Sequence, residues 1–385
     1  MIGQCLVFLL LAESAFGENL TKFFQKKNCD PKCTFETQNL TSHSLAFFPT
    51  DCSTVCTHLS INEHTDLTEA QLASTFLSMK RLIGSLTVMD TKFKSISFLA
   101  GLEAVECGQY SIVLDFNNQM IEFGLTNLTS ISCSNFEIIG YKKLRNLGFP
   151  NLKSITLDEF SSPFDEFVRL YIDPDSIDFC ITVEEMETLI SAEDVNVDGI
   201  YGKYCTPTTS ENLCTFPEIC PKIFGDVEVG SSSSIDSLKF MEIIFGSLII
   251  NGTNLTNFNF LENLKYVAQL TKGKSAVIVQ NNPLLLNVSF PKLKRVRSDN
   301  LHTVVFTKNN RNLSLDVNAC FGLRSDLGIT THWSPTFDGE NCYLINDTAN
   351  WLKKNKASSN QGSLGLLIFI SALIFADLTS TFSGF

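Results

Sequence analysis

The chain has few of the side chains on which most enzymes and nucleic-acid-binding proteins depend. Its 385 residues include only five histidines, and no two of them have the spacing of a zinc-binding HExxH helix. No G-x-S-x-G nucleophile turn and no phosphate-binding glycine loop is present. Lysine and arginine number 29 against 41 aspartates and glutamates, so a net charge of −12 leaves no basic face for phosphates. We therefore expect no catalysis, no cofactor and no nucleic-acid partner.

One segment resembles part of a calcium loop. Asp194, Asn196, Asp198 and Gly199 have the spacing with which an EF-hand loop begins. The twelfth position of such a loop supplies a bidentate glutamate, and here that position is Cys205. We therefore expect no metal site.

No apolar run reaches the twenty or so residues that a membrane-spanning helix needs. Residues 1–17 hold a short apolar run that ends in small residues, which is typical of a secretory signal peptide. A second short run lies in a hydrophobic tail, residues 364–385. Small residues and a polar spacer precede it, which predicts a GPI anchor with Ser358 as the attachment residue. A short transmembrane segment or a merely hydrophobic tail is the alternative, and either anchor implies a protein at the outer cell surface.

Cysteine and asparagine indicate the same compartment. Removal of Cys5 with the signal peptide leaves twelve cysteines, which suits six disulfides outside the reducing cytosol. Eight asparagines stand in N-x-S/T sequons, which accept N-linked glycans in the secretory pathway. They are Asn19, Asn39, Asn127, Asn251, Asn254, Asn287, Asn312 and Asn346. We expect an extracellular glycoprotein.

The second half of the chain repeats the first. Residues 82–105 align without a gap on residues 244–267 at a constant offset of 162. Within this match, Gly84-Ser85-Leu86 corresponds to Gly246-Ser247-Leu248. A shorter period of about 25 residues runs inside each half, as in the overlay of residues 113–131 on residues 137–155. The chain therefore consists of two similar domains, each built from shorter repeats.

Each short repeat joins one β-rich run to one leucine-containing phrase. That combination is typical of a parallel solenoid, whose coils must stack because no coil can cover its own apolar face. Alternation along the strands predicts that Leu86, Val88, Ile112 and Leu114 face the core. Phenylalanines at equivalent corners predict a stacked aromatic core, and asparagines just after the strands predict side chains that bond the backbone there.

The order of these motifs resembles the receptor L domains of the insulin and epidermal-growth-factor receptors. From Cys220 to Cys320 the phrases FGSLII, LENLKYV and FPKLKRV follow one another as in an L domain, and the first half follows the same order from Cys56. The resemblance implies a mainly β fold with short helices. It consists of two tandem right-handed parallel β-helices of the leucine-rich solenoid type, capped by disulfides. It gives L domains at residues 18–205 and 214–345, a linker at 206–213 and a polar stalk at 346–363.

The chain departs from the receptors in two ways. Receptors of this family carry a long Cys-rich module between their L domains, whereas here only eight residues separate Cys205 from Cys214. No kinase follows the second domain. In both respects the chain is similar to the L-domain-only surface proteins of nematodes.

The cysteines are placed as this resemblance requires. Cys29, Cys33, Cys52 and Cys56 would hold the start of the first domain, with their connectivity open and a zinc site as the rival. The remaining expected pairs are Cys107 with Cys133, Cys180 with Cys205, Cys214 with Cys220, and Cys320 with Cys342.

Two functions remain open on the sequence. The resemblance implies recognition of a protein or peptide, such as an insulin-like or EGF-like peptide, or pairing with a receptor, on one sheet face. On that face the outward residues of two strands are the candidate binding residues Thr87, Met89, Val113 and Asp115. The alternative is a structural or adhesive coat protein without a peptide ligand. The placement of the glycans discriminates between them. Sequons that leave one solenoid face bare in both repeats would favour binding, whereas sequons that shield every face would favour a coat protein.

Overall fold

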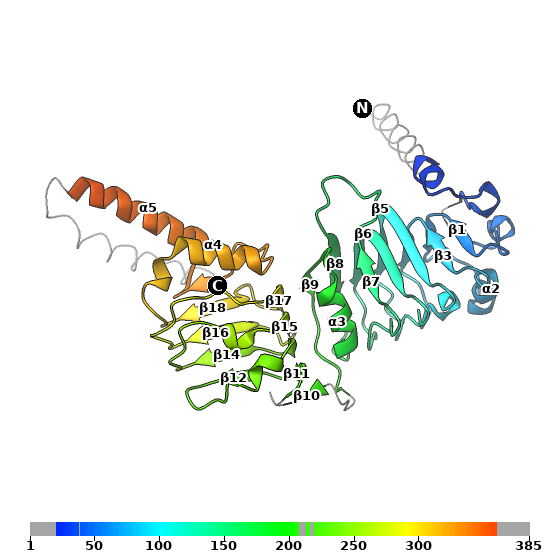
Figure 1. The fold of residues 1–385 in the computed structure, drawn as a ribbon. Coiled ribbons are helices and arrows are strands. Elements are labelled where there is room, and N and C mark those ends of the chain that lie inside the picture. The colour runs from blue at the N-terminus through cyan, green and yellow to red at the C-terminus, as the bar shows by residue number, and fades with distance from the viewer. Residues whose placement is uncertain (1–20, 38, 208–212, 216–218, 360–385) are drawn as a thin grey trace, which may run out of the picture.

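The computed structural model describes residues 21–37, 39–207, 213–215 and 219–359. These residues form two stacks of short strands (Figure 1). We call residues 21–207 the first solenoid and residues 213–359 the second solenoid. The predicted signal peptide, the sequon at Asn19 and the hydrophobic tail lie outside the described residues.

The first solenoid is built on one nine-stranded sheet in which every strand pairing is parallel. The long strands β5 and β6 run through both of its ladders. Helices α2, Glu69–Thr75, and α3, Val183–Ser191, lie against its coils. The strands are β1 Thr54–Cys56, β2 Leu59–Ile61, β3 Arg81–Ile83, β4 Leu86–Met89, β5 Ala104–Asp115, β6 Ser130–Ile139, β7 Ser154–Thr156, β8 Val168–Asp173 and β9 Val195–Ile200.

The second solenoid has two sheets. One has the order β10-β11-β13-β15-β17 and the other β12-β14-β16-β18-β19-β20, with only the last pair antiparallel. Helices α4, Val317–Asp326, and α5, Cys342–Ser359, close its end. The strands are β10 Leu213–Cys214, β11 Lys222–Phe224, β12 Val227–Val229, β13 Ile243–Phe245, β14 Leu248–Asn251, β15 Tyr266–Gln269, β16 Val277–Gln280, β17 Arg295–Ser298, β18 Val304–Thr307, β19 Thr336–Phe337 and β20 Glu340–Asn341.

The prediction of two tandem parallel solenoids is confirmed. Gly84 joins β3 to β4, and Gly246 joins β13 to β14, so the repeated segments occupy the same place in each solenoid. The short 3₁₀ turns Ser97–Leu99 and Asn259–Leu261 are related by the same offset. The internal repeat of the sequence is therefore a repeat of the fold.

The core lies between the sheets and the corners of the coils. Leu86 stands opposite Ile112 and Val88 opposite Leu114, and all four side chains are buried as predicted. At the corners, aromatic rings stack from coil to coil. The ring centroids of Phe123 and Phe149 are 5.5 Å apart, and those of Phe258 and Phe290 are 4.6 Å apart. Burial of these rings, together with the aliphatic side chains around them, stabilises the stacking of the coils.

Asparagine side chains stabilise the turns that follow the strands. The Asn117 side chain donates to the carbonyls of Val88 and Asp115 and accepts from the backbone N–H of Thr91. Asn282 makes the equivalent bonds in the second solenoid. Since both asparagines are fully buried, these bonds satisfy backbone groups that the sheets leave unpaired.

Six disulfides join the twelve cysteines of the described chain. Four of them link the pairs that we expected, and the four cysteines whose connectivity was open pair as Cys29–Cys56 and Cys33–Cys52. Cys107 and Cys133 lie on the adjacent strands β5 and β6, with 4.6 Å between their Cα atoms. The disulfides thus join neighbouring coils and close the ends of both solenoids.

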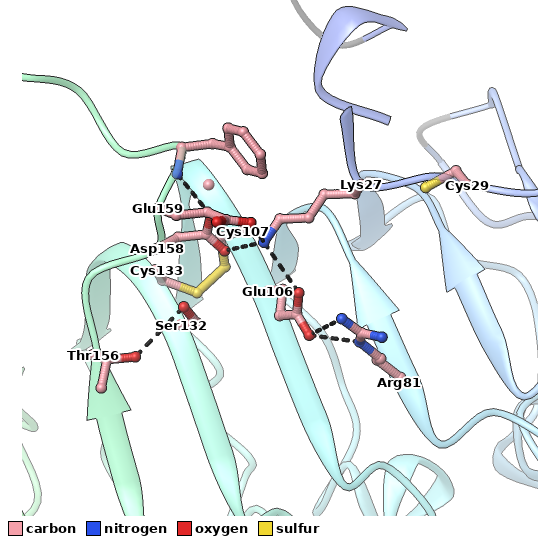
Figure 2. A network of polar contacts seen from close by, with 12 residues as sticks. Lys27, Cys29, Arg81, Glu106, Cys107, Ser132, Cys133, Thr156, Asp158 and Glu159 are labelled. Carbon is pink, nitrogen blue, oxygen red and sulfur yellow. Dashed lines mark hydrogen bonds and ion pairs between the residues drawn. A yellow bond between two sulfur atoms is a disulfide. The ribbon is translucent and has the colours of Figure 1, made fainter. Parts of the chain in front are cut away.

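A partly buried ion-pair network attaches the N-terminal segment to the first solenoid (Figure 2). The Lys27 Nζ lies 3.2 Å from Glu106 Oε2 and 3.0 Å from Asp158 Oδ2, and Arg81 pairs with the other oxygen of Glu106. Burial alone would lower the pKa of Lys27, but the carboxylates of Asp158 and Glu106 raise it above its usual value. The network therefore favours the charged form of Lys27 and lies beside the Cys107–Cys133 disulfide.

Candidate functional site

Strands β4, β5, β6 and β8 of the first solenoid share an outer face. Residues in register on parallel strands point the same way, so two rows of side chains cross this face. The first row is Thr87, Val113, Glu137 and Tyr171, and the second is Met89, Asp115, Ile139 and Asp173. We call these eight residues the first sheet face.

The register brings together all four residues that sequence reasoning selected. Thr87, Met89 and Val113 are half-buried. The expectation that Asp115 is an outward surface residue is wrong, because its side chain is only 6% exposed. Its carboxylate turns back onto the sheet and accepts a hydrogen bond of 3.0 Å from the backbone N–H of Ile139.

Sequence reasoning missed the half of this face that β6 and β8 supply. Tyr171 is its most prominent side chain, with 38% of its surface exposed. Its hydroxyl donates to Asp173, and its ring meets that of Tyr201 edge-on at 5.9 Å. The β-rich run at residues 136–141 could have predicted that Glu137 points outward. The sequence after Ile155 does not follow the repeat, so the register of β8 could not be predicted. The complete face combines an exposed aromatic ring with carboxylates.

Burial makes the Asp115 carboxyl sensitive to pH. Loss of solvation, reinforced by the nearby Glu137 carboxylate, raises the pKa of Asp115 to about 6, although the Ile139 N–H opposes the shift. Since the folded state holds this proton more tightly than the unfolded chain does, the stability of the fold decreases as pH rises from about 4 to about 6.

We expect Asp115→Asn to raise the free energy of unfolding at pH 7.5 by about 1–2 kcal/mol and to leave it nearly unchanged at pH 4. The amide oxygen still accepts the Ile139 N–H but carries no charge. Urea denaturation at both pH values measures the difference. Asp173→Asn, an exposed carboxylate in the same row, is the matched control. An equal gain for Asp115→Asn at both pH values would contradict the buried charge as the cause.

The two solenoids pack directly against each other, a contact that the sequence did not reveal. Tyr204, which follows the first solenoid's last strand, packs its ring edge-on against both Phe224 and Phe245, with centroids 5.8 and 5.7 Å away. Its hydroxyl donates to the carbonyl of Ala268 at 2.8 Å. Burial in this apolar contact raises the pKa of Tyr204 well above its usual value. The hydrophobic core of the first solenoid therefore continues through the junction to Phe245 and Ala268 of the second solenoid.

Two arginines of β17 complete this junction. Arg295 donates to the carbonyls of Ile190, Ala192 and Glu193 at the end of α3, at 3.0, 2.5 and 2.8 Å. A cation at a helix C-terminus satisfies carbonyls that have no partner within the helix. Arg297 is 1% exposed and bonds the first solenoid's Ile200 carbonyl.

A groove of about 600 Å³ runs between α3 and the coil corners of the first solenoid. Phe136, Phe149 and Leu189 contribute to its apolar lining. The carboxylates of Glu122 and Glu184 stand at its rim and form no ion pair with any described residue. The groove could accept an apolar side chain that is followed by a basic one.

Comparison with known proteins identifies the family. The model of the receptor L domain family matches residues 51–186 and 219–322. The chain belongs to the receptor L domain family. A relative in Caenorhabditis elegans, Protein irld-34, is 24% identical over 303 residues, which cover 72% of this chain and 69% of the relative. The family, this relative and the six disulfides indicate a receptor-related extracellular protein.

The predicted glycosylation sequons are distributed unevenly over the two L domains. Apart from Asn346, which is half-buried in α5, every sequon asparagine that the structure describes is exposed. None of them lies on β4, β5, β6 or β8, but Asn39 bridges Ser60 on β2, which is in register with Thr87, so one sequon stands in the first row beyond β4. By the offset of 162, Asn251 on β14 stands where Met89 stands on β4. The equivalent face of the second L domain thus contains a sequon, and this face is not bare in both repeats.

Within the described ranges of this L-domain protein, no three or more His, Cys, Asp or Glu side chains group as a metal ion would need. Cys205, at the end of the calcium-loop resemblance, is bonded to Cys180. No helix of residues 21–359 that the structure describes is long and apolar enough to cross a membrane. The candidate attachment residue Ser358 lies within α5.

Proposed function

We propose that this protein is a cell-surface glycoprotein that binds a protein or peptide ligand, or pairs with a receptor, through the first sheet face. The observation that carries the proposal is the contrast between the two L domains. The four strands of the first face contain no described sequon, whereas the corresponding strands of the second domain contain Asn251. Exposed Tyr171 supplies the kind of aromatic anchor on which binding energy concentrates.

The charge of this face suggests the chemistry of its ligand. Glu137 and Asp173 flank Tyr171, and the whole chain has a net charge of −12. A ligand with a basic residue beside an apolar one would complement both the ring and the carboxylates. Insulin-like and EGF-like peptides are the first candidates, because the family includes the receptors of such peptides. Anchoring through the C-terminal tail, as a GPI anchor or a short membrane span, is part of the proposal and would hold both L domains outside the cell.

A coat or adhesive protein is the second candidate. The sequons Asn127, Asn254, Asn287 and Asn312 lie on exposed turns and loops of both solenoids and favour a shielded surface. The two functions differ in one respect that can be measured. A coat protein has no saturable peptide ligand, and substitutions on the first sheet face would not change its behaviour.

We expect the full chain on the surface of transfected cells to bind a labelled insulin-like or EGF-like peptide saturably. Tyr171→Ala combined with Glu137→Lys should weaken that binding by about 2 kcal/mol, roughly thirtyfold, because it removes the aromatic anchor and reverses a charge. Glu228→Lys makes the same charge change at an exposed position of the second domain's sheet and serves as the control. Equal loss in both variants would place the ligand elsewhere, and no saturable binding by the unaltered chain would favour the coat protein.

A further inference from the structure

The second L domain has an aliphatic row on the outside of its sheet. Ile249, Ile278 and Val305 stand in register on β14, β16 and β18. All three are half-buried and point away from the core, since their neighbours along each strand are buried. Beside the first two lies a hollow of about 350 Å³. Its lining is Glu228, Val229, Gly230, Ile249, Asn251, Ile278 and Gln280.

The asparagine of a sequon lines this same hollow. Asn251 comes two residues after Ile249 on β14, so both side chains lie on one face of the sheet. The side-chain amide oxygen of Asn251, Oδ1, accepts a hydrogen bond of 2.9 Å from Asn281 Nδ2. That bond fixes the amide through its oxygen and does not use Nδ2, the atom to which N-linked sugars are attached.

We propose that Asn251 carries an N-linked glycan whose first sugar ring occupies this hollow and covers Ile249 and Ile278. In the modification, Asn251 Nδ2 attacks the anomeric carbon of a polyprenyl-diphosphate-linked oligosaccharide. The new N–C bond forms as the polyprenyl diphosphate leaves with the electron pair of the broken C–O bond, and Nδ2 loses one proton. The glycan is then an intramolecular partner of the sheet.

The size and chemistry of the hollow fit this occupant. Its volume of about 350 Å³ lies at the lower end of small-molecule sites, enough for one or two sugar rings. The C–H face of a sugar ring can cover the isoleucines, while Glu228 and Gln280 can bond its hydroxyls. Without a cover, the half-buried aliphatic row would leave apolar surface accessible to solvent on the outside of the sheet, which favours self-association.

Asn254 provides a matched control within the same loop. It is an exposed sequon asparagine three residues after Asn251, and it does not line the hollow. A glycan at Asn254 should therefore be free in solvent. The proposal predicts different behaviour for two glycans on neighbouring sequons, and it does not depend on whether the first sheet face binds a ligand.

The test is the release of both glycans from the native full chain made in eukaryotic cells. We expect mass spectrometry of glycopeptides to show Asn251 occupied and a peptide-N-glycanase to release its glycan about tenfold more slowly than that of Asn254. Tenfold corresponds to about 1.4 kcal/mol, which burial of roughly 55 Å² of apolar surface supplies. Ile249→Ser with Ile278→Ser should bring the two rates together. Asn281→Gly, which removes only the bond to the Asn251 oxygen, should preserve most of the difference.

A second measurement keeps the proposal testable if the serine variant folds poorly. Trimming by an endoglycosidase that leaves only the first sugar should keep binding of a hydrophobic dye low. Asn251→Gln should raise dye binding, whereas Asn254→Gln should not. An unmodified Asn251, equal release rates at the two sites, or equal dye binding by the two glutamine variants would overturn the proposal.

Discussion

Replacing Gly84 or Gly246 by alanine is expected to lower the free energy of unfolding by at least about 3 kcal/mol. A Cβ on Gly84 would overlap the backbone carbonyl of Thr57 on the preceding coil, and one on Gly246 would overlap that of Gly225. Gly84 also has a φ of 130°, which strains any residue with a side chain. Since a backbone carbonyl cannot turn aside as a side chain can, the coils would have to separate.

Urea denaturation of the purified protein measures this loss, and the amount secreted reports it where a variant does not fold. Gly322→Ala is the control, because this glycine lies in helix α4, and an added Cβ has no heavy atom within 4 Å. Alanine should be neutral or slightly stabilising there. If Gly84→Ala unfolded at the same urea concentration as the unaltered chain, close approach of the coils could not explain why both repeats have glycine.

These two glycines also show which part of the fold could be predicted from the sequence. A solenoid repeats the same local contacts in every coil. The residues that make these contacts, here glycines, leucines and asparagines, therefore recur in the sequence at the period of the coil. This recurrence predicts the repeated positions of the fold. They are Gly84 and Gly246, the buried residues of β4 and β5, and Asn117 and Asn282. Each of them is determined by contacts with the next coil, which lies one period away.

Features that depend on irregular segments could not be predicted. The position of Tyr171 beside Glu137 depends on the loop between β7 and β8, which has no counterpart in the repeat. Asp115 was expected to face outward because alternation describes the direction of a side chain from the strand. Alternation does not describe how a short carboxylate then turns back to a neighbouring N–H, so the burial of Asp115 was missed.

The contact between the two solenoids could not be predicted for a different reason. The alternating Arg295 and Arg297 of β17 look like the solvent-exposed face of a strand, and their partners lie about a hundred residues earlier in the chain. A weak signal was present in β13, whose three residues are all apolar and all buried. A strand of an open sheet is buried on both faces only when something covers its outside. Here the cover is the end of the first L domain.

Tyr204→Ala is expected to divide the unfolding of this protein into two transitions. In the unaltered chain the ring of Tyr204 joins the two cores, and its removal should cost about 3–5 kcal/mol of coupling between them. Differential scanning calorimetry should then show one cooperative transition before the substitution and two after it, with the lower one shifted by several degrees.

Tyr204→Phe separates packing from hydrogen bonding, because it keeps the ring and loses only the bond to the Ala268 carbonyl. We expect it to cost about 1 kcal/mol and to preserve the single transition. A single transition at an unchanged temperature in Tyr204→Ala would show that the junction does not couple the L domains. If the coupling holds, the Tyr204 junction joins the two L domains into one cooperative unit across a connection of only eight residues between Cys205 and Cys214.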